Sequence, residues 1–511
     1  MTTDDKKAIN TSSTPSLWIS DCPIKEYPVL TKDLSTQVLI IGGGITGLSC
    51  AYELTEAGFD VVLIEKDELC SKATGNSTGK LTLQHSSQYS DLLAKNMTQA
   101  AQDLLASQTK AIARFREITA QLDIDCDQIE TKAVLYGRTK SELKVIDKEQ
   151  AAYDQLGIPY EVVAIEFEEG RGLAVDGQIG INAAKYVYAL ADHLSQRGVL
   201  IFEHSQAQNE LELTPAGNQV KVNNNFTITA QYVIIASGYP AIDGGGNYSF
   251  RLVPSRSLAL AYPCATIEHK MYISQEEPLH SVRYSQSPEN YLILVGGSHR
   301  VAFESSVQSL QDNMKQFAQT QFGAATPAFS WSAQDYLTAD LLPYIGRLTE
   351  KEEHQTVFVA TGFRKWGLGF GIWTGLYLTD LIKENAPEIE TFRPARDMLV
   401  KIALDQTVDK TKMVINAITE RQRVKHLDDI GINQAGIVKV GGKKTGVWVD
   451  AAGQPNFVNL SCTHMGCTLH WNDLDQTYDC PCHGSRFTKE GYVIEGPAGR
   501  DLDEQKGDHK T

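Results

Sequence analysis

Two nearly continuous apolar runs, at residues 38–41 and 61–64, flank a stretch whose apolar positions recur at helical spacing. A run without polar alternation is typical of a strand buried on both faces, as in a parallel sheet. The pattern predicts a strand, a helix and a second strand at the start of an α/β domain. Further along, a helix over 182–198 and a strand over 199–202 extend the same arrangement.

Residues 91–123 repeat apolar positions at helical spacing, and we expect one long amphipathic helix there. Alternating stretches at 133–136 and 161–167 predict strands of a second sheet. More strand signals follow at 257–262, 271–274, 281–284 and 291–295, with a helix over 304–322. Segments of the α/β domain stand both before and after the strands of the second sheet. We therefore expect two interleaved subdomains, of which the second is built on an antiparallel sheet.

From residue 384 to about 426 the pattern becomes charged and poorly periodic, which indicates a linker with some helix. A flexible tether would favour Gly, Ser or Pro, and this stretch has few of them, so we expect a fixed mount. Short β runs at 437–440, 445–449 and 457–460 then predict a small all-β domain.

Composition narrows the classes of function. The 511 residues are 42% hydrophobic and carry a formal net charge of -16, which argues against nucleic-acid and membrane-surface partners, since both demand basic patches. No stretch approaches the eighteen apolar residues of a membrane span, and the N-terminus lacks the apolar core of a signal peptide. We expect a cytoplasmic protein, and five singly scattered cysteines agree with a reducing compartment.

The turn after the first strand contains Gly42, Gly44 and Gly47 in the G-x-G-x-x-G spacing of a dinucleotide fingerprint. Gly42 suits the tight turn, Gly44 the close approach of a pyrophosphate, and Gly47 the packing of helix on strand. Glu65, at the end of the second strand, is placed to accept hydrogen bonds from a ribose. Strand, glycines, helix and acid are all in register, and together they predict nucleotide binding.

The fingerprint alone does not separate FAD from NAD. A buried strand at 232–237 runs into a small-residue turn at Gly238, and residues 357–368 read as a strand, a turn at Gly362 and a helix start at Gly367, suited to lie beside a flavin ring. The glycines from 367 to 371 do not make a second fingerprint, because the third glycine is absent at the required offset. We therefore expect no NAD(P)H domain and a reductant that binds at the flavin itself.

Two boxes near the C-terminus carry Cys and His. The first reads Cys462-Thr-His464-Met-Gly-Cys467 and the second Cys480-Pro-Cys482-His483-Gly-Ser485. Their spacing matches a Rieske 2Fe-2S site, in which each box supplies one Cys and one His, here Cys462 with His464 and Cys480 with His483. Tetrahedral zinc and a disulfide knot are the alternatives, but zinc boxes usually read Cys-x-x-Cys, so we favour the cluster.

The segments at 42–65, 75–85, 232–240 and 340–368 together resemble the D-amino-acid oxidase superfamily, which includes glycine and sarcosine oxidases. The chain from residue 16 onward is similar to bacterial FAD-dependent oxidoreductases that carry a C-terminal Rieske domain. The resemblance implies FAD and a 2Fe-2S cluster as cofactors. It implies these flavin contacts: Gly42, Gly44, Ile45, Thr46, Gly47, Glu65, Lys66, Ser77, Thr78, Gly79, Lys80, Gly238, Gly362, Lys365, Trp366, Gly367 and Leu368.

For the cluster, the resemblance implies a disulfide between Cys467 and Cys482 that ties the two loops together. Ser485 resembles the Rieske serine that hydrogen-bonds a bridging sulfide and raises the potential. Phe487 departs from the family pattern, because high-potential members have a Tyr there that bonds a cysteine sulfur. Hydrogen bonds to sulfur favour the reduced cluster, so we expect an intermediate potential.

The expected fold is an α/β Rossmann-like FAD domain interleaved with an α+β antiparallel-sheet substrate domain, plus a small all-β C-terminal Rieske domain. The expected boundaries are a lead-in at 1–35, the oxidoreductase domain at 36–385, a linker at 386–426 and the Rieske domain at 427–511. Within the oxidoreductase domain, the FAD part is expected at about 36–90, 175–245 and 335–385, and the substrate part at about 91–174 and 246–334.

The favoured activity is oxidation of a small substrate, an amine or amino acid, at a C-N bond, with electrons leaving FAD through the cluster to an external partner such as a ferredoxin. Two rivals stay open: a flavin monooxygenase charged through the cluster, and a non-catalytic electron carrier. The sequence identifies no catalytic side chain.

Each of four basic side chains and one histidine has two possible roles. Lys80 and Lys365 are either positive charges beside the flavin or solvated lysines. Arg256 and Arg283 either bind a substrate carboxylate or have a structural role. His85 is either a covalent flavin attachment point or, as we prefer, a packed histidine.

Overall fold

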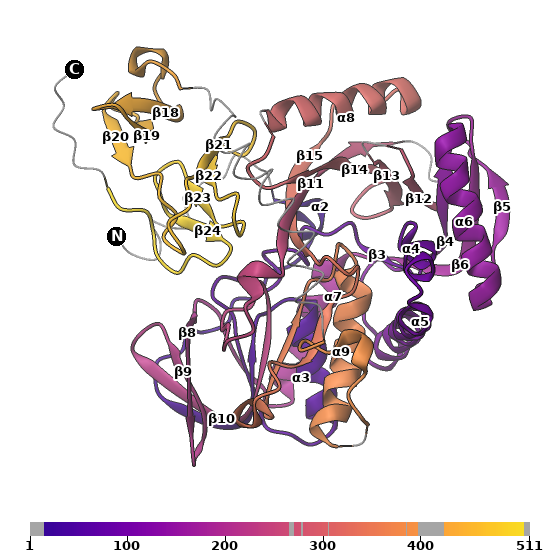
Figure 1. The fold of residues 1–511 in the computed structure, drawn as a ribbon, viewed down its shortest axis with the longest axis horizontal. Coiled ribbons are helices and arrows are strands. Elements are labelled where there is room, and N and C mark those ends of the chain that lie inside the picture. The colour runs from indigo at the N-terminus through magenta and orange to yellow at the C-terminus, as the bar shows by residue number, and fades with distance from the viewer. Residues whose placement is uncertain are drawn as a thin grey trace.

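The computed structural model describes residues 15–264, 270–276, 279–304, 306–384, 386–396 and 424–504. Figure 1 shows an α/β domain at the bottom, a large second sheet above it, and a C-terminal β domain beside the end of that sheet. Most of the expected linker, with its predicted helix, lies outside the described residues.

The α/β domain is built on a sheet of order β16-β17-β10-β1-β2-β7, parallel from β17 to β7, with β16 antiparallel at the edge. A β8-β9 hairpin continues antiparallel from the first half of β10. The strands are β1 (Leu34–Ile41), β2 (Val61–Ile64), β7 (Leu200–Phe202), β8 (Ala207–Thr214), β9 (Gly217–Val222), β10 (Phe226–Gly238), β16 (Tyr344–Arg347) and β17 (Val357–Thr361).

The apolar run of β1 is buried on both faces of this sheet. Val38 and Ile40 belong to one hydrophobic cluster, and Leu39 and Ile41 to another on the opposite face. The first cluster includes side chains of α3 (Ile45–Glu56), α7 (Ala183–Gln196) and α9 (Gly367–Ile382). Successive side chains of a strand point to opposite faces of the sheet, and here both faces are covered by apolar side chains. This explains why β1 has no polar positions at its C-terminal end.

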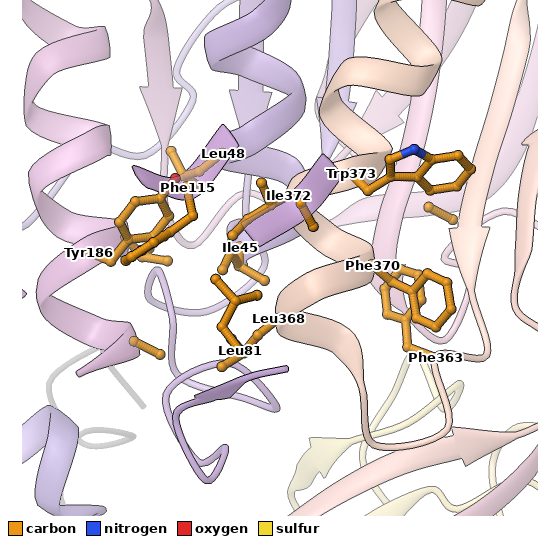
Figure 2. Packing of buried hydrophobic residues seen from close by; sticks show 14 of the residues in the cluster. Ile45, Leu48, Leu81, Phe115, Tyr186, Phe363, Leu368, Phe370, Ile372 and Trp373 are labelled. Atoms are coloured by element: carbon orange, nitrogen blue, oxygen red, sulfur yellow. The ribbon is translucent and has the colours of Figure 1, made fainter. Parts of the chain in front are cut away.

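Helices α3 and α9 pack closely because α9 presents glycines to α3. A Cβ built at Gly371 would lie 2.8 Å from Ile45 Cγ2, and one at Gly375 would lie 2.6 Å from the Ser49 carbonyl oxygen. Figure 2 shows Ile45 and Leu48 of α3 next to Ile372 and Leu368 of α9. Gly371 and Gly375 therefore serve the packing of α9 on α3.

The second sheet has the order β15-β11-β14-β13-β12-β4-β6-β3, with β5 beside β6, and is antiparallel except for the β12-β4 pair. Helix α8 (Val307–Phe322) covers one face (Figure 1). The strands are β3 (Lys80–Leu81), β4 (Ile129–Gly137), β5 (Glu161–Ala164), β6 (Arg171–Gly180), β11 (Val253–Pro263), β12 (Lys270–Ser274), β13 (Ser281–Ser285), β14 (Tyr291–Arg300) and β15 (Phe329–Leu337). The remaining α-helices of the described residues are α2 (Leu17–Ser20), α4 (Gln88–Ala94), α5 (Thr98–Gln121) and α6 (Lys140–Leu156).

The long amphipathic helix predicted over 91–123 is confirmed as α5, but the predicted start was wrong, because residues 91–94 belong to the separate helix α4. Helix α4 ends at Ala94, and Asn96 has a φ of 59°, in the left-handed region that Asn tolerates better than most residues. Helix α5 then starts afresh at Thr98. Helical periodicity continued through the break, because both helices bury apolar faces against the same core.

The C-terminal domain contains two small antiparallel sheets, β18-β19-β20 and β21-β22-β23-β24. The strands are β18 (Ala435–Val440), β19 (Lys443–Val449), β20 (Pro455–Val458), β21 (His470–Asn472), β22 (Thr477–Asp479), β23 (Arg486–Thr488) and β24 (Val493–Glu495). The buried Tyr478 hydroxyl lies 3.1 Å from the carbonyl oxygens of both Gly436 and Val447, so it joins the sheets. The two Cys-His boxes are the loops before β21 and between β22 and β23.

In the part of the chain that the structure describes, no helix is both long and apolar enough to cross a bilayer.

Candidate functional site

Three glycine turns end neighbouring parallel strands at one edge of the α/β sheet. Gly42, Gly238 and Gly362 follow or end β1, β10 and β17, with φ of 120°, 76° and 74°. A Cβ at Gly42 would lie 2.5 Å from the Ala236 carbonyl oxygen, whereas one at Gly238 would meet no described atom within 4 Å. Ligands of open α/β sheets bind at this carboxyl edge, and the turns leave room for backbone to approach one there.

Helix α3 begins at this edge with its amides directed at the turn. A Cβ at Gly47 would lie 1.9 Å from the Gly42 carbonyl oxygen, so only glycine fits. Gly44 is the N-cap and has no side chain to cap the helix, and the Ile45 amide donates to Thr74 Oγ1 at 3.1 Å. Further first-turn amides, including that of Thr46, suit a phosphate group.

Glu65 follows β2 and is held by backbone amides. Its carboxylate accepts hydrogen bonds from Gly43 N at 2.7 Å and Asp67 N at 3.0 Å. Burial raises the pKa of this carboxyl, Asp67 adds to the rise, and the two amide bonds oppose it. The carboxylate is thus fixed beside the glycine turn, where a ribose would lie. Lys66 pairs with Asp67 at 3.6 Å.

The loop at 75–80 is fixed by donors from three distant segments that bind its carbonyl oxygens. Trp18 Nε1 donates to Ser77 O at 2.8 Å, and Trp331 Nε1 donates to Asn76 O at 3.1 Å. Arg283 Nη1 donates to Thr78 O at 2.8 Å and to Gly79 O at 2.5 Å. The polar segment after the βαβ unit is therefore a rigid part of the junction between the two sheets.

These contacts decide between the two interpretations of Arg283. Its side chain is fully buried, lies over the Trp18 ring and is bound to backbone oxygens, so it has a structural role. Lys80 is also buried, and its ammonium group donates to Tyr272 O at 2.9 Å and Ser281 Oγ at 2.5 Å. Burial, reinforced by Arg283, lowers the pKa of Lys80 well below its usual range. Lys80 is not a solvated lysine; its contact with flavin stays a prediction.

The turn between β17 and α9 is strained. Arg364 and Lys365 have φ of 53° and 75°, a conformation that costs non-glycine residues energy and that is common at functional sites. The strain is supported by Asp335, which accepts the Lys365 amide, and by Thr338 O, which accepts from Arg364. Lys365 Nζ lies 2.6 Å from Ser298 Oγ. The turn therefore has one defined conformation in front of α9.

Helix α9 starts beside this turn without a side-chain cap at its N-cap residue, Trp366, and without an acidic residue in its first turn. Its first amides, at Gly367 and Leu368, are suited to a group that gains negative charge. The Trp366 ring stacks on His85, with centroids 4.3 Å apart and planes within 3°. Burial lowers the pKa of His85 to about 3, which agrees with our preference for a packed histidine.

The four predicted cluster ligands lie together at the tips of two loops. His464 Nδ1 and His483 Nδ1 are 3.2 Å apart, so both imidazoles point at one position. Cys462 and Cys480 are buried and share a hydrogen bond. Two thiols on one side and two imidazoles on the other are the donor set of a Rieske centre, and they fit such a cluster.

Hydrogen-bond donors surround the two sulfurs. The pKa of Cys462 is lowered, chiefly by Cys480 and, against burial, by the amide of His464 and the hydroxyl of Ser485. The amides of His483 and Cys482 donate to Cys480. Such donors stabilise negative charge on cluster sulfur. Phe487 is fully buried in the same core.

Cys467 and Cys482 form the disulfide that the resemblance implied. The sulfurs of these two residues and of Cys480 lie within 4.8 Å of one another. That arrangement is no separate metal site, because a disulfide offers no thiolate.

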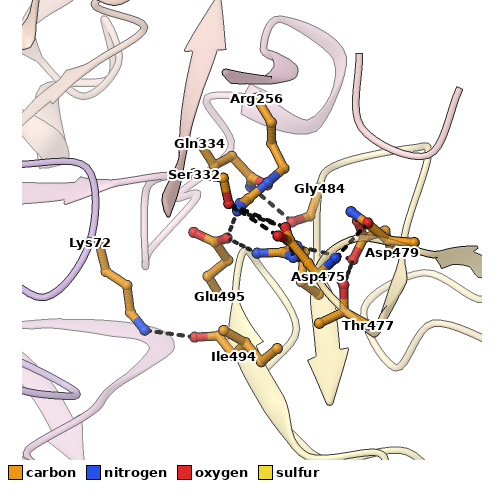
Figure 3. A network of polar contacts seen from close by, with 12 residues as sticks. Lys72, Arg256, Ser332, Gln334, Asp475, Thr477, Asp479, Gly484, Ile494 and Glu495 are labelled. Carbon is orange, nitrogen blue, oxygen red and sulfur yellow. Dashed lines mark hydrogen bonds and ion pairs between the residues drawn. The ribbon is translucent and has the colours of Figure 1, made fainter. Parts of the chain in front are cut away.

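The C-terminal domain docks on the second sheet through buried charges (Figure 3). Arg256 of β11 pairs with Glu495 at 2.5 Å and with Asp475 at 3.2 Å, and its side chain is 4% exposed. Arg486 pairs with the same two carboxylates from within its own domain. Ser332 also donates to Asp475, and Lys72 Nζ donates to Ile494 O at 2.9 Å.

Both terminal guanidinium nitrogens of Arg256 are therefore engaged by carboxylates of the C-terminal domain, and the substrate-carboxylate interpretation is wrong for this residue. No local pattern indicates this pairing, since Arg256 and Asp475 are 219 positions apart. The docking turns the histidine side of the cluster loops toward the α/β domain. His464 meets Tyr239, the residue after Gly238, with ring centroids 6.3 Å apart, and His483 is 8% exposed.

The comparisons with known proteins agree with this architecture. Residues 37–381 match the family described as FAD dependent oxidoreductase, and residues 420–505 match the Rieske [2Fe-2S] domain. The chain belongs to the FAD-dependent oxidoreductase family and carries a C-terminal Rieske domain. It is an oxidoreductase whose cofactors are FAD and a 2Fe-2S cluster.

One relative shares both parts of the chain. The putative Rieske 2Fe-2S iron-sulfur protein YhfW of Bacillus subtilis is 32% identical over 94% of this chain and 95% of its own length. Gamma-glutamylputrescine oxidoreductase of Escherichia coli is 23% identical over 72% of this chain and 88% of its own length. Glycine oxidase from Geobacillus kaustophilus superposes with a TM-score of 0.61 at 19% identity, over 71% of this chain and all of that one, which shows the fold.

Proposed function

We propose that this protein oxidises a small amine or amino acid at a C-N bond and that the electrons leave the flavin one at a time through the Rieske cluster to an external acceptor protein such as a ferredoxin. FAD accepts the two electrons of the substrate, and the cluster carries single electrons. The observation that carries this proposal is the docked position of the cluster loops, whose histidine side meets the carboxyl edge of the FAD-type sheet at Tyr239.

In this proposal the α3 end of the site holds the nucleotide. First-turn amides of α3, including that of Thr46, bind the pyrophosphate, and Glu65 binds the ribose. The loop at 77–80, the turns at Gly238 and Gly362, and the residues from 365 to 368 surround the flavin. The uncapped amides of α9 stabilise negative charge on the reduced ring.

Cys462, His464, Cys480 and His483 hold the cluster in the same proposal. The disulfide between Cys467 and Cys482 and the donors to the sulfurs keep the loops in place. Reversal of the electron flow would use the same ligands, so the direction is a separate question for experiment.

The substrate class is supported by the relatives. The names of gamma-glutamylputrescine oxidoreductase and glycine oxidase both describe proteins that act on amines. The buried guanidinium of Arg283 at the junction of the sheets adds positive potential to that region, which suits a carboxylate-bearing substrate.

Anaerobic titration tests the function. A panel of amines and amino acids, including glycine and gamma-glutamylputrescine, should bleach the flavin absorbance and then produce the electron paramagnetic resonance signal of a reduced Rieske cluster. Bleaching without that signal would remove the cluster from the path. Reduction by a ferredoxin, with no bleaching by any amine, would favour the monooxygenase or carrier alternatives.

Cluster removal is the second test. His464→Ala and Cys480→Ala should give yellow protein that retains FAD and is still bleached by substrate, but has no cluster signal and does not reduce a one-electron acceptor protein. His470→Ala, on neighbouring β21, is the matched control and should keep the cluster. Full turnover with the acceptor in cluster-free protein would contradict the relay.

A further inference from the structure

Tyr239 occupies the contact between the cluster loops and the α/β domain. It directly follows Gly238 at the carboxyl edge of the sheet, and its ring is T-shaped against His464 with centroids 6.3 Å apart. On its other side it packs against Tyr336 of β15, with centroids 5.4 Å apart. The ring pair thus spans from one predicted cluster ligand into the body of the oxidoreductase domain.

Tyr336 has a second connection to the cluster loops. Gln334 Nε2 lies 3.0 Å from the Tyr336 hydroxyl and donates at 2.9 Å to the carbonyl oxygen of Gly484, the residue after His483. A Cβ at Gly484 would lie 2.5 Å from Pro254 Cβ, so the loop is pressed against β11. The first loop therefore contacts Tyr239 directly, and the second loop is joined to Tyr336 through Gln334.

The opposite end of this pair reaches the strained turn that we assign to the flavin. The Arg364 amide donates to Tyr336 O at 3.3 Å, and Asp335, the neighbour of Tyr336, accepts the Lys365 amide. Tyr239 meanwhile shares the Gly238 turn, whose carbonyl oxygen accepts from Thr361 Oγ1 at 2.5 Å. Continuous van der Waals and hydrogen-bond contacts thus run from His464 and Gly484 to the turns at 238 and 362–365.

We propose that the Tyr239 ring, backed by Tyr336, is the bridge through which electrons pass between the flavin site and the cluster at His464. This inference rests on the proposed function. In each transfer one electron leaves the reduced flavin and one ferric iron of the cluster becomes ferrous; no bond to Tyr239 forms or breaks, and the proton released by the flavin passes to solvent. A one-electron acceptor protein later reoxidises the cluster.

Neither side chain of the bridge is ionised at neutral pH, because the usual pKa of a tyrosine is about 10 and burial raises it further at both positions. The bridge acts through the contact of its ring, since electron transfer slows steeply when a gap replaces packed atoms. The hydroxyl of Tyr239 is not required.

Pulse radiolysis tests the bridge without a substrate. A radiolytic radical delivers one electron to the anaerobic holoenzyme, and the redistribution between flavin and cluster is followed by absorbance. Tyr239→Leu should slow this redistribution about tenfold, equivalent to about 1.4 kcal/mol in the barrier, with unchanged midpoint potentials and cluster signal. Tyr239→Phe keeps the ring and should keep the rate.

The matched control is Tyr232→Leu, a half-buried tyrosine of β10, the strand that ends just before Tyr239; it packs against Phe59, away from the cluster. Its rate should equal that of the unmodified protein. An unchanged rate in Tyr239→Leu, or equal slowing in Tyr239→Phe, would overturn the bridge. Slower electron redistribution in Tyr239→Leu together with a changed small-angle scattering profile would also overturn the bridge, because Tyr239 would then act only in docking of the Rieske domain. If no amine bleaches the flavin, the substrate assignment fails while this rate can still be measured.

Discussion

Single hydrogen-bond donors near the cluster sulfurs set its potential. The Ser485 hydroxyl lies beside Cys462 and accepts the Ala498 amide at 3.1 Å, whereas Phe487, in the same core, has no donor. Phe487→Tyr should raise the midpoint potential and Ser485→Ala should lower it, each by roughly 50 mV for about 1 kcal/mol of differential hydrogen bonding. Redox titration monitored by paramagnetic resonance measures both.

Leu469→Met serves as the control for that pair, since it changes a buried side chain of the same cluster of apolar residues without adding a donor. Its potential should stay within the error of the titration. A midpoint potential in Phe487→Tyr that does not exceed that of the unmodified protein would mean that the new hydroxyl does not reach a sulfur.

His85 makes stability depend on pH. Its pKa falls to about 3 in the folded protein, below the usual value of about 6.5, so between these values the unfolded chain binds the extra proton. Stability is therefore lost as the pH falls from 6.5 toward 3, on the order of 2 kcal/mol by pH 5. His85→Phe keeps a ring stacked on Trp366 and should reduce the drop in Tm between pH 7 and pH 5, measured by calorimetry.

The exposed His204 offers the comparison for this effect. His204→Phe should leave the pH dependence of Tm as it is, since this side chain lies at the surface. An unchanged Tm difference in His85→Phe would show that other groups produce the acid sensitivity.

At the scale of elements, the packing of α3 against α9 positions the N-termini of both helices at the proposed flavin site. A Cβ at Gly375 would lie 2.6 Å from Ser49 O, so Gly375→Ala should cost about 1–3 kcal/mol of overpacking, less about 1 kcal/mol of gained helix propensity. We expect a lower Tm and weaker FAD retention, measured by calorimetry and by flavin release on dilution. Asp380→Ala, exposed on the same helix, should change neither.

Local patterns predicted most of these elements, because the βαβ unit and the Cys-His boxes are short stretches whose spacing fixes their geometry. Residue 96 shows the limit: apolar periodicity passes through it, and only its left-handed backbone ends α4. Arg283 shows another, since its buried bonds to the loop at 78–79 depend on chain segments more than 200 residues apart. The buried charges at the Rieske interface and the contact of Tyr239 with His464 also join distant chain segments, so local patterns did not predict them.

At the scale of the whole molecule, the buried charges at the interface fix the Rieske domain. Removal of Arg256 leaves Asp475 and Glu495 buried with less compensation, a change that typically costs about 3–5 kcal/mol. Arg256→Ala should therefore release the domain, seen as a larger radius of gyration in small-angle scattering and slower reduction of the cluster by substrate. Arg116→Ala, which breaks a surface pair with Glu130, is the control and should change neither.

Acid should release the domain in the same way. Burial alone would raise the pKa of Glu495, yet Arg256 and Arg486 lower it to about 2, and the same arginines lower that of Asp475. A carboxyl whose folded pKa is depressed stabilises the docked state above its free value of about 4.3 and loses this contribution as the pH falls toward 2. Scattering between pH 6 and pH 3 should show undocking that begins below about pH 4.3. In Glu495→Gln, whose side chain is uncharged at every pH, docking of the Rieske domain should already be weaker at pH 6 and should respond less to acid. An acid response equal to that of the unmodified protein would assign the release to other carboxylates.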